Sequence, residues 1–321
     1  MNQHASKQAP QRRSLWNRRC LPIAVTLVWL LIQCGGDSAG EAQAQSEDVD
    51  SISSRTEPIV VAPADAGERD YLIQSKYSDA AGHEQLFQVA VTVFSPAGEI
   101  QGDVLVLPGW DHHRLRYLNE TGVKQAATQR RMRLICPQMD RSVYASAYFP
   151  ETRMRWQPKP GQPFILEDLI PHMQAQGYLR PKGNNYLLGI STGARGAALI
   201  ALAKPDLFRG VALLSGDYDQ STMPNDTLMT ATYGPYDQFA ERWQHTDNVQ
   251  SRVADWKLPV YIWHGSQDSI VPFQQSQDLY RALQKAHPDL SVQFHAPTAG
   301  HDYPFWDAAT PAALDFLLQY K

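Results

Sequence analysis

Cysteine is scarce in this sequence, with three residues in a chain of 321. Two of them, Cys20 and Cys34, lie in an N-terminal segment that we expect to be a targeting signal. Cys136 is then the only cysteine certain to remain in the mature chain, which excludes an intrachain disulfide. Its apolar neighbours predict a buried strand in which Cys136 is an unreactive core residue. With 43% hydrophobic residues, the chain can instead bury one large core.

The sequence also lacks an excess of positive charge. Its formal net charge is −4, and the first 33 residues hold five of its basic residues and no acid. The rest of the chain is therefore more acidic than the whole. This gives it no electrostatic reason to bind nucleic acid or an anionic membrane surface. No internal repeat is evident.

The N-terminal apolar stretch is too short for a membrane-spanning helix. Residues 20–32 make thirteen positions, whereas a span needs roughly 20 residues. Basic residues precede the stretch, so it predicts the apolar region of a secretory signal.

The end of this stretch, Leu31-Ile-Gln-Cys34, resembles a bacterial lipobox, in which the cysteine becomes the lipidated first residue. Gln33 departs from that pattern, because a small residue is expected before the cysteine. Membrane anchoring through a lipidated Cys34 stays open beside two alternatives, cleavage at a small-residue site such as after Gly40 and an uncleaved anchor. We expect an exported protein, periplasmic or a membrane-anchored lipoprotein. Residues 1–34 would be its signal and 35–68 a flexible tether too polar to fold.

The most informative segment is Gly189-Ile-Ser191-Thr-Gly193. Apolar residues before it predict a strand, and the small residues from Ala194 to Ala203 predict a helix after it. A G-x-S-x-G sequence between strand and helix is typical of a nucleophile elbow, a tight turn that exposes the serine hydroxyl. The helix N-terminus directs N–H groups and a positive dipole end at the same point. The alternative is a glycine-flanked turn with a bystander serine.

A serine nucleophile needs a base, and in such folds an acidic residue and then a histidine follow the serine. Asp268 follows an apolar strand in the loop His264-Gly-Ser-Gln-Asp268, and His301 follows the next strand. Both lie at the carboxyl ends of strands, where open α/β sheets place their sites. Asp217, after the preceding strand, is a rival for the acid. His264 and His295 are expected to be structural.

These segments resemble α/β-hydrolases of the bacterial putative-esterase type, akin to antigen-85-like and feruloyl-esterase-like proteins. The matching pieces are Leu107-Pro-Gly-Trp110, Gly189-Ile-Ser-Thr-Gly193, His264-Gly-Ser-Gln-Asp268 with Val271-Pro272, and Gly300-His301. The resemblance spans residues 70 to 321. It implies the α/β-hydrolase fold but no particular substrate, because this fold hosts many reactions. It also implies the Trp110 N–H as an oxyanion donor, beside the Thr192 N–H that follows the nucleophile.

The pattern along the chain predicts one domain, residues 69–321, with a mostly parallel eight-stranded sheet and helices on both faces. The first two strands alternate and lie close together, which favours an antiparallel hairpin at one edge. Residues 218–255 show no clear strand and predict a small partial cap. The predicted strands are 71–76, 86–94, 104–107, 133–136, 186–190, 211–215, 260–263 and 292–295; the predicted helices are 117–130, 165–176, 192–203, 274–286 and 304–319.

Three side chains are candidates for substrate contact. The Trp110 ring would line the acyl pocket, unless it only covers the edge of the core. His112 would lie at the rim of the site. Tyr148 belongs to a polar and aromatic segment, residues 144–156, that would form either one wall of the cleft or a solvated loop. We expect no catalytic metal, because no H-x-x-x-H or H-E-x-x-H spacing occurs.

The sequence therefore predicts a serine hydrolase that needs no cofactor. We expect a carboxylic ester hydrolase that acts through Ser191, His301, Asp268 and an acyl-enzyme on a small-molecule or sugar-linked ester. One alternative is a serine peptidase of prolyl-peptidase-like type, which the absence of a propeller or other gating domain disfavours. The other is a non-catalytic binding lipoprotein on a hydrolase scaffold, which a lost triad residue would favour, and none is lost. The sequence indicates no oligomeric state.

Overall fold

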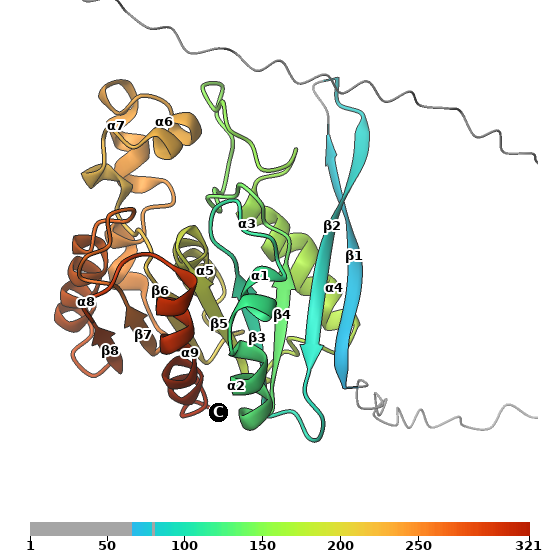
Figure 1. Ribbon diagram of the computed structural model, residues 1–321. Coiled ribbons are helices and arrows are strands. Elements are labelled where there is room, and N and C mark those ends of the chain that lie inside the picture. The colour runs from blue at the N-terminus through green and yellow to red at the C-terminus, as the bar shows by residue number, and fades with distance from the viewer. Residues whose placement is uncertain (1–65, 79–80) are drawn as a thin grey trace, which may run out of the picture. The chain divides into compact units, whose positions relative to one another are not determined.

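The computed structural model describes residues 66–78 and 81–321, and its centre is an eight-stranded sheet (Figure 1). The strand order is β1-β2-β4-β3-β5-β6-β7-β8. The six strands β4-β3-β5-β6-β7-β8 are parallel to one another. At the edge, β1 pairs antiparallel with β2, and β2 pairs antiparallel with β4. The predicted parallel sheet and its edge hairpin are thus confirmed. The strands are β1 (Gly67–Ser78), β2 (Glu84–Ser95), β3 (Gly102–Leu107), β4 (Met132–Pro137), β5 (Asn185–Ile190), β6 (Gly210–Leu214), β7 (Val260–Trp263) and β8 (Val292–His295).

Helices cover both faces of the sheet and enclose one apolar core on each face. In β3, Leu105 and Leu107 belong to one core while Val104 and Val106 belong to the other, as the alternation of strand side chains requires. The first core also takes side chains from η1, α4, α5 and α8, and the second from α1, α2 and α9. The helices are α1 (Arg116–Glu120), α2 (Val123–Arg130), α3 (Gly161–Pro163), the π-helix η1 (Phe164–Leu169), α4 (Ile170–Ala175), α5 (Thr192–Ala203), η2 (Gln220–Thr222), α6 (Thr227–Tyr233), α7 (Tyr236–His245), η3 (Gln250–Asp255), α8 (Gln274–Ala286) and α9 (Tyr303–Leu317).

One helix prediction is wrong, because residues 117–130 form α1 and α2 instead of a single helix. Thr121 between them is extended, with φ −132° and ψ 170°. Its hydroxyl donates to Tyr117 O at 2.5 Å. The N–H of Gly122 donates to Asp307 Oδ1, a side chain of α9, at 2.8 Å. These contacts replace intrahelical bonds, so the first helix ends and a second begins. The helix predicted at 165–176 also begins earlier, at Gly161.

Residues 218–255 contain no strand and form the helices η2, α6, α7 and η3. Figure 1 shows α6 and α7 at the end of the sheet where the parallel strands finish. An apolar cluster joins this segment to the loop after β4 and consists of Val143, Ala145, Met229, Tyr233 and Trp243. The predicted cap is therefore a helical layer with a small core of its own, and we call these five residues the cap cluster.

The predicted signal, Cys34 and nearly all of the predicted tether lie outside the described residues. None of the helices in the described part of the chain is long and apolar enough to cross a membrane. Cys136 is a free, buried residue of β4, and burial raises the pKa of its thiol to about 12.

Candidate active site

Ser191 occupies a tight turn between β5 and α5. Its backbone has φ 55° and ψ −126°, a conformation that residues with a side chain rarely adopt. A Cβ on Gly189 would lie 2.1 Å from Gly193 O, and one on Gly193 would lie 2.0 Å from Leu107 O. The turn therefore requires both glycines, and it packs directly against the end of β3.

Three side chains from separate loops form one hydrogen-bonded row. Ser191 Oγ lies 2.9 Å from His301 Nε2, and His301 Nδ1 lies 2.6 Å from Asp268 Oδ2. The ionised carboxylate can only accept, so Nδ1 carries the hydrogen and Nε2 is left to accept from the Ser191 hydroxyl. The structure thus brings together the three residues that the sequence singled out. This arrangement can take a proton from the serine as it attacks.

The loops that carry Asp268 and His301 are joined through their backbones. Gln267 N–H donates to Ala299 O at 3.0 Å. A Cβ on Gly265 would lie 2.3 Å from the same oxygen, so only glycine allows the two loops to approach this closely. The close approach places the carboxylate beside the imidazole.

Trp306 of α9 fixes the plane of the His301 ring. The two rings meet edge to face, with centroids 4.9 Å apart and an angle of 86° between their planes. Trp306 is buried, and its indole N–H donates to Ser215 Oγ at 3.0 Å. The orientation of the imidazole is therefore tied to the end of β6.

The Asp268 carboxylate is fully buried, and all its hydrogen bonds come from the protein. Oδ1 accepts from the N–H groups of Ile270 and Val271, each at 2.9 Å. Oδ2 faces His301 Nδ1 at 2.6 Å and His264 Nε2 at 3.2 Å. Burial opposes ionisation, but these hydrogen bonds outweigh it and hold the pKa of Asp268 far below its usual value. Asp268 is therefore charged at neutral pH.

Asp217, the rival acid, is engaged elsewhere. Its Oδ2 lies 2.9 Å from Arg195 Nη1, and the side chains of both residues are buried. Arg195 also donates to the Tyr233 hydroxyl at 3.1 Å and to Asp247 O at 2.7 Å, both in the cap segment. Asp217 therefore balances the charge of an arginine that ties the elbow helix α5 to the cap.

Two backbone N–H groups beside Ser191 are candidates for an oxyanion hole. Among the described residues, neither the Thr192 N–H nor the Trp110 N–H has a hydrogen-bond acceptor. The loop that carries Trp110 approaches the serine closely, because a Cβ on Gly109 would lie 3.1 Å from Ser191 Cβ. Two free donors next to Ser191 can stabilise an oxyanion that forms there.

A family model described as putative esterase matches residues 122–317. The chain belongs to this family. The matched range contains Ser191, Asp268 and His301, whereas Trp110 and His112 precede it. No curated protein matches the sequence.

Solved structures share the fold of this esterase-family chain at low identity. FphF, a fluorophosphonate-binding serine hydrolase of Staphylococcus aureus with substrate bound, has a TM-score of 0.58 and 20% identity, covering 78% of this chain and 98% of its own. The S-formylglutathione hydrolase of Agrobacterium tumefaciens has a TM-score of 0.61 and 17% identity, covering 79% and 95%. MPT51 (FbpC1) of Mycobacterium tuberculosis has a TM-score of 0.61 and 14% identity, covering 80% and 99%. This likeness shows the α/β-hydrolase fold, so the predicted fold is confirmed.

His112 lies beside the hydrogen-bonded row of this esterase-family chain. A Cβ on Gly109 would be 2.9 Å from His112 Nδ1 and 3.1 Å from Ser191 Cβ, so both residues flank one glycine. The Tyr303 hydroxyl lies 3.0 Å from His112 Nδ1. Burial is the main cause that lowers the pKa of His112 to about 4, and nearby positive charge adds to it. A neutral imidazole therefore stands next to the site, and its contact with substrate stays a prediction.

Trp110 and Tyr148 have their described contacts away from Ser191. The Trp110 ring packs against the cap cluster. The Tyr148 hydroxyl accepts from the Trp156 N–H at 3.0 Å, within its own loop. Among the described contacts neither side chain touches Ser191, so their roles in substrate binding also stay predictions.

The neighbours of His112 have their own partners. Asp111 Oδ2 lies 3.3 Å from Arg141 Nη2, and His113 Nε2 lies 3.2 Å from Arg114 Nη1. In residues 66–78 and 81–321, no group of three or more His, Cys, Asp or Glu side chains is placed to hold a metal ion.

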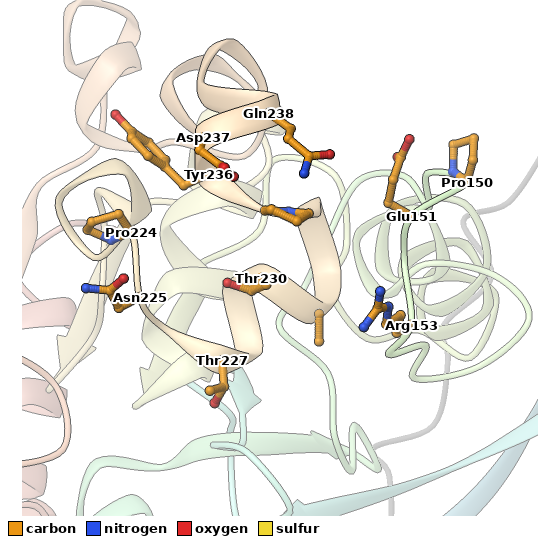
Figure 2. Close-up of a pocket in the computed structure, with 12 residues that line it drawn as sticks. Pro150, Glu151, Arg153, Pro224, Asn225, Thr227, Thr230, Tyr236, Asp237 and Gln238 are labelled. Atoms are coloured by element: carbon orange, nitrogen blue, oxygen red, sulfur yellow. The ribbon is translucent and has the colours of Figure 1, made fainter.

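The cap contains a cavity of about 940 Å³. Figure 2 shows Thr227 and Thr230 of α6 and Tyr236 at the start of α7 on one side, with Glu151 and Arg153 of the loop after β4 on the other. None of the three residues of the hydrogen-bonded row lines it. The segment 144–156 thus contributes to a cavity, but this cavity belongs to the cap and not to the Ser191 site itself.

Three buried side chains support the site through contacts that sequence reasoning did not predict. Trp306 is one of them. Tyr144 is the second: its hydroxyl donates to Pro108 O at 2.7 Å, and its ring fills the space over Gly196 of α5. The third is His264, which contacts Asp268. Only His264 carried a local signal, its position within the motif that contains Asp268.

Proposed function

We propose that this chain is a serine esterase that hydrolyses carboxylic esters through an acyl-enzyme on Ser191. The observation that carries the proposal is the hydrogen-bonded row at the elbow, with Ser191 Oγ 2.9 Å from His301 and His301 2.6 Å from Asp268. Membership of the putative esterase family supports it. A non-catalytic binding protein would have no need of an ionised, fully buried carboxylate behind a histidine that faces a serine.

The first half of the reaction forms the acyl-enzyme. Ser191 Oγ attacks the ester carbonyl carbon, and its proton passes to His301 Nε2. Asp268 keeps the imidazole in the tautomer with hydrogen on Nδ1 and stabilises the imidazolium that forms. The negative charge on the carbonyl oxygen is directed to the N–H groups of Thr192 and Trp110. The C–O bond to the alcohol then breaks, and His301 donates its proton to the departing oxygen.

The second half repeats these steps with water. His301 takes a proton from a water molecule, which attacks the acyl carbon, and the same N–H groups face the oxyanion. Collapse of this intermediate releases the carboxylic acid and returns the proton to Ser191 Oγ. A small-molecule or sugar-linked ester is the substrate class that we propose.

The exchange Ser191→Ala tests the proposal. It removes the attacking oxygen, so hydrolysis of a model ester should fall by about 10⁶-fold, and labelling by a fluorophosphonate probe should disappear. Ser266→Ala, at an exposed serine of the Asp268 loop, is the matched control and should keep both. A folded Ser191→Ala protein that turns over ester at the parent rate would refute the proposal. A parent protein that cleaves only peptides in a parallel panel would favour the peptidase alternative.

A further inference from the structure

His264 directly follows β7, and its side chain is completely buried. Its Nδ1 lies 2.7 Å from the hydroxyl oxygen of Ser276, in the first turn of α8. Its Nε2 lies 3.1 Å from Val271 O and 3.2 Å from Asp268 Oδ2. One imidazole thus contacts two residues of the loop that joins β7 to α8 and one residue of α8, and one of these partners is the acid of the proposed triad.

The partners of His264 determine where its hydrogen lies. Val271 O and the ionised Asp268 carboxylate can only accept, so Nε2 must carry a hydrogen. The Ser276 hydroxyl can donate, so Nδ1 can accept from it. A neutral His264 with hydrogen on Nε2 therefore accepts from Ser276 at Nδ1 and donates from Nε2 to Val271 O, and Asp268 Oδ2 lies close enough to share that hydrogen.

We propose that His264 is a positioning residue of this esterase, which donates from Nε2 to the same Asp268 oxygen that accepts from His301. The inference rests on the proposed function. Asp268 would then act between two imidazoles: His301 faces the serine, and His264 holds the carboxylate from behind. A histidine that served only to pack the loop would need no contact with that oxygen.

The shared oxygen couples His264 to the basicity of His301. A donor at Oδ2 draws negative charge away from His301, so its loss leaves a stronger charge beside the imidazolium. The imidazolium would then be stabilised in the variant, so activity would be lost at a higher pH as the solution is made more acidic. Asp268 itself would remain ionised, because Oδ1 keeps the N–H groups of Ile270 and Val271.

Few other titratable groups of the described residues face this pair. His112 lies near His301, and its pKa of about 4 leaves it neutral over most of the pH range. Tyr218, next to Ser276, has a pKa raised by burial and is uncharged. Asp217 is balanced by Arg195. The acidic limb of the pH profile should therefore report on His301.

The test compares His264→Leu and His264→Gln through the pH dependence of kcat/KM with a small ester. His264→Leu removes the donor, so we expect kcat to fall by about 10- to 100-fold and the acidic limb to move up by about one pH unit. His264→Gln keeps an N–H that can reach Oδ2 and should restore most of both changes. His287→Leu is the matched control, because it removes an imidazole 2.7 Å from Val253 O that has no contact with Asp268.

A purely structural role would lower the melting temperature and leave the acidic limb in place. A folded His264→Leu protein with the parental kcat, or with a limb that is unmoved or moves down, overturns the inference. If His264→Leu does not fold, His264→Met decides, because its flexible apolar side chain also lacks a donor to Asp268 Oδ2; an upward shift of the limb supports the inference and an unmoved limb overturns it. Ser191→Ala in the same assay separates the two proposals, because a parent whose ester turnover does not depend on Ser191 refutes the proposed function instead.

Discussion

The two buried aspartates that follow β6 and β7 should fail in different ways when each is changed to asparagine. Asp217→Asn removes the carboxylate 2.9 Å from Arg195, where the two side chains are 5% and 0% exposed. Breaking a buried ion pair from one side leaves an uncompensated charge and costs about 3–5 kcal/mol. At this chain length that lowers the melting temperature by roughly 10 °C. Because neither side chain of the pair has a described hydrogen bond to Ser191, His301 or Asp268, the folded molecules should keep kcat within a few-fold of the parent.

Asp268→Asn should have the opposite pattern, a large loss of kcat with a smaller loss of stability. The amide keeps the shape of the side chain but loses the charge that holds His301 in its working tautomer. The corresponding exchange in the best-studied Ser-His-Asp protease lowers kcat by about 10⁴-fold, and we expect a loss of that order. The N–H groups of Ile270 and Val271 can still donate to the side-chain oxygen of the asparagine, so the melting temperature should fall less than in Asp217→Asn.

Ester turnover per folded molecule, with the folded fraction taken from circular dichroism, separates these outcomes. Asp315→Asn is the control for loss of a carboxylate, because its pair with Arg130 has the acid 61% exposed and such pairs contribute about 0–1 kcal/mol. The reasoning is refuted if Asp217→Asn abolishes turnover in folded protein while Asp268→Asn is mild. It is also refuted if Asp217→Asn has the same melting temperature as Asp315→Asn.

Two further predictions concern His112 and the N-terminus. Folding lowers the pKa of His112 from 6.5 to about 4, so the unfolded chain takes up the proton first, and stability present above pH 6.5 is lost as the pH falls toward 4. His112→Asn should therefore reduce the pH dependence of the free energy of unfolding between these values, measured by urea denaturation at a series of pH values. An unchanged pH dependence would contradict the assignment. We also propose export with lipidation at Cys34, so Cys34→Ser should move the protein from the membrane to the soluble fraction. A soluble parent with its mature N-terminus beyond Cys34 would leave a plain secretory signal, and an intact N-terminus on cytoplasmic protein would reject export.

The parts of the fold that the sequence predicted are those whose cause is local. Strands such as β5 are buried on both faces, so they are continuous apolar runs with a recognisable end. The elbow was predictable because its glycines and its serine lie within five positions. The break between α1 and α2 was not, since both sides have ordinary helical residues and the group that binds Gly122 is Asp307, far along the chain. The internal arrangement of the cap depends in the same way on contacts between distant residues.

The support of the site shows the same limit at a finer scale. Trp306 and Tyr144 act on the site through contacts with Ser215 and Pro108, which belong to other elements, so no pattern around either aromatic residue marks it. His264 differs, because all its partners lie within the next 12 residues of the chain, in the loop after β7 and the first turn of α8. A histidine four residues before the acid can reach that acid only if the loop turns back on itself, and Ser276 and Val271 are the points where it does so. The motif His264-Gly-Ser-Gln-Asp268 therefore contains both Asp268 and a histidine that contacts it, and the sequence alone does not show this contact because it forms only when the loop folds.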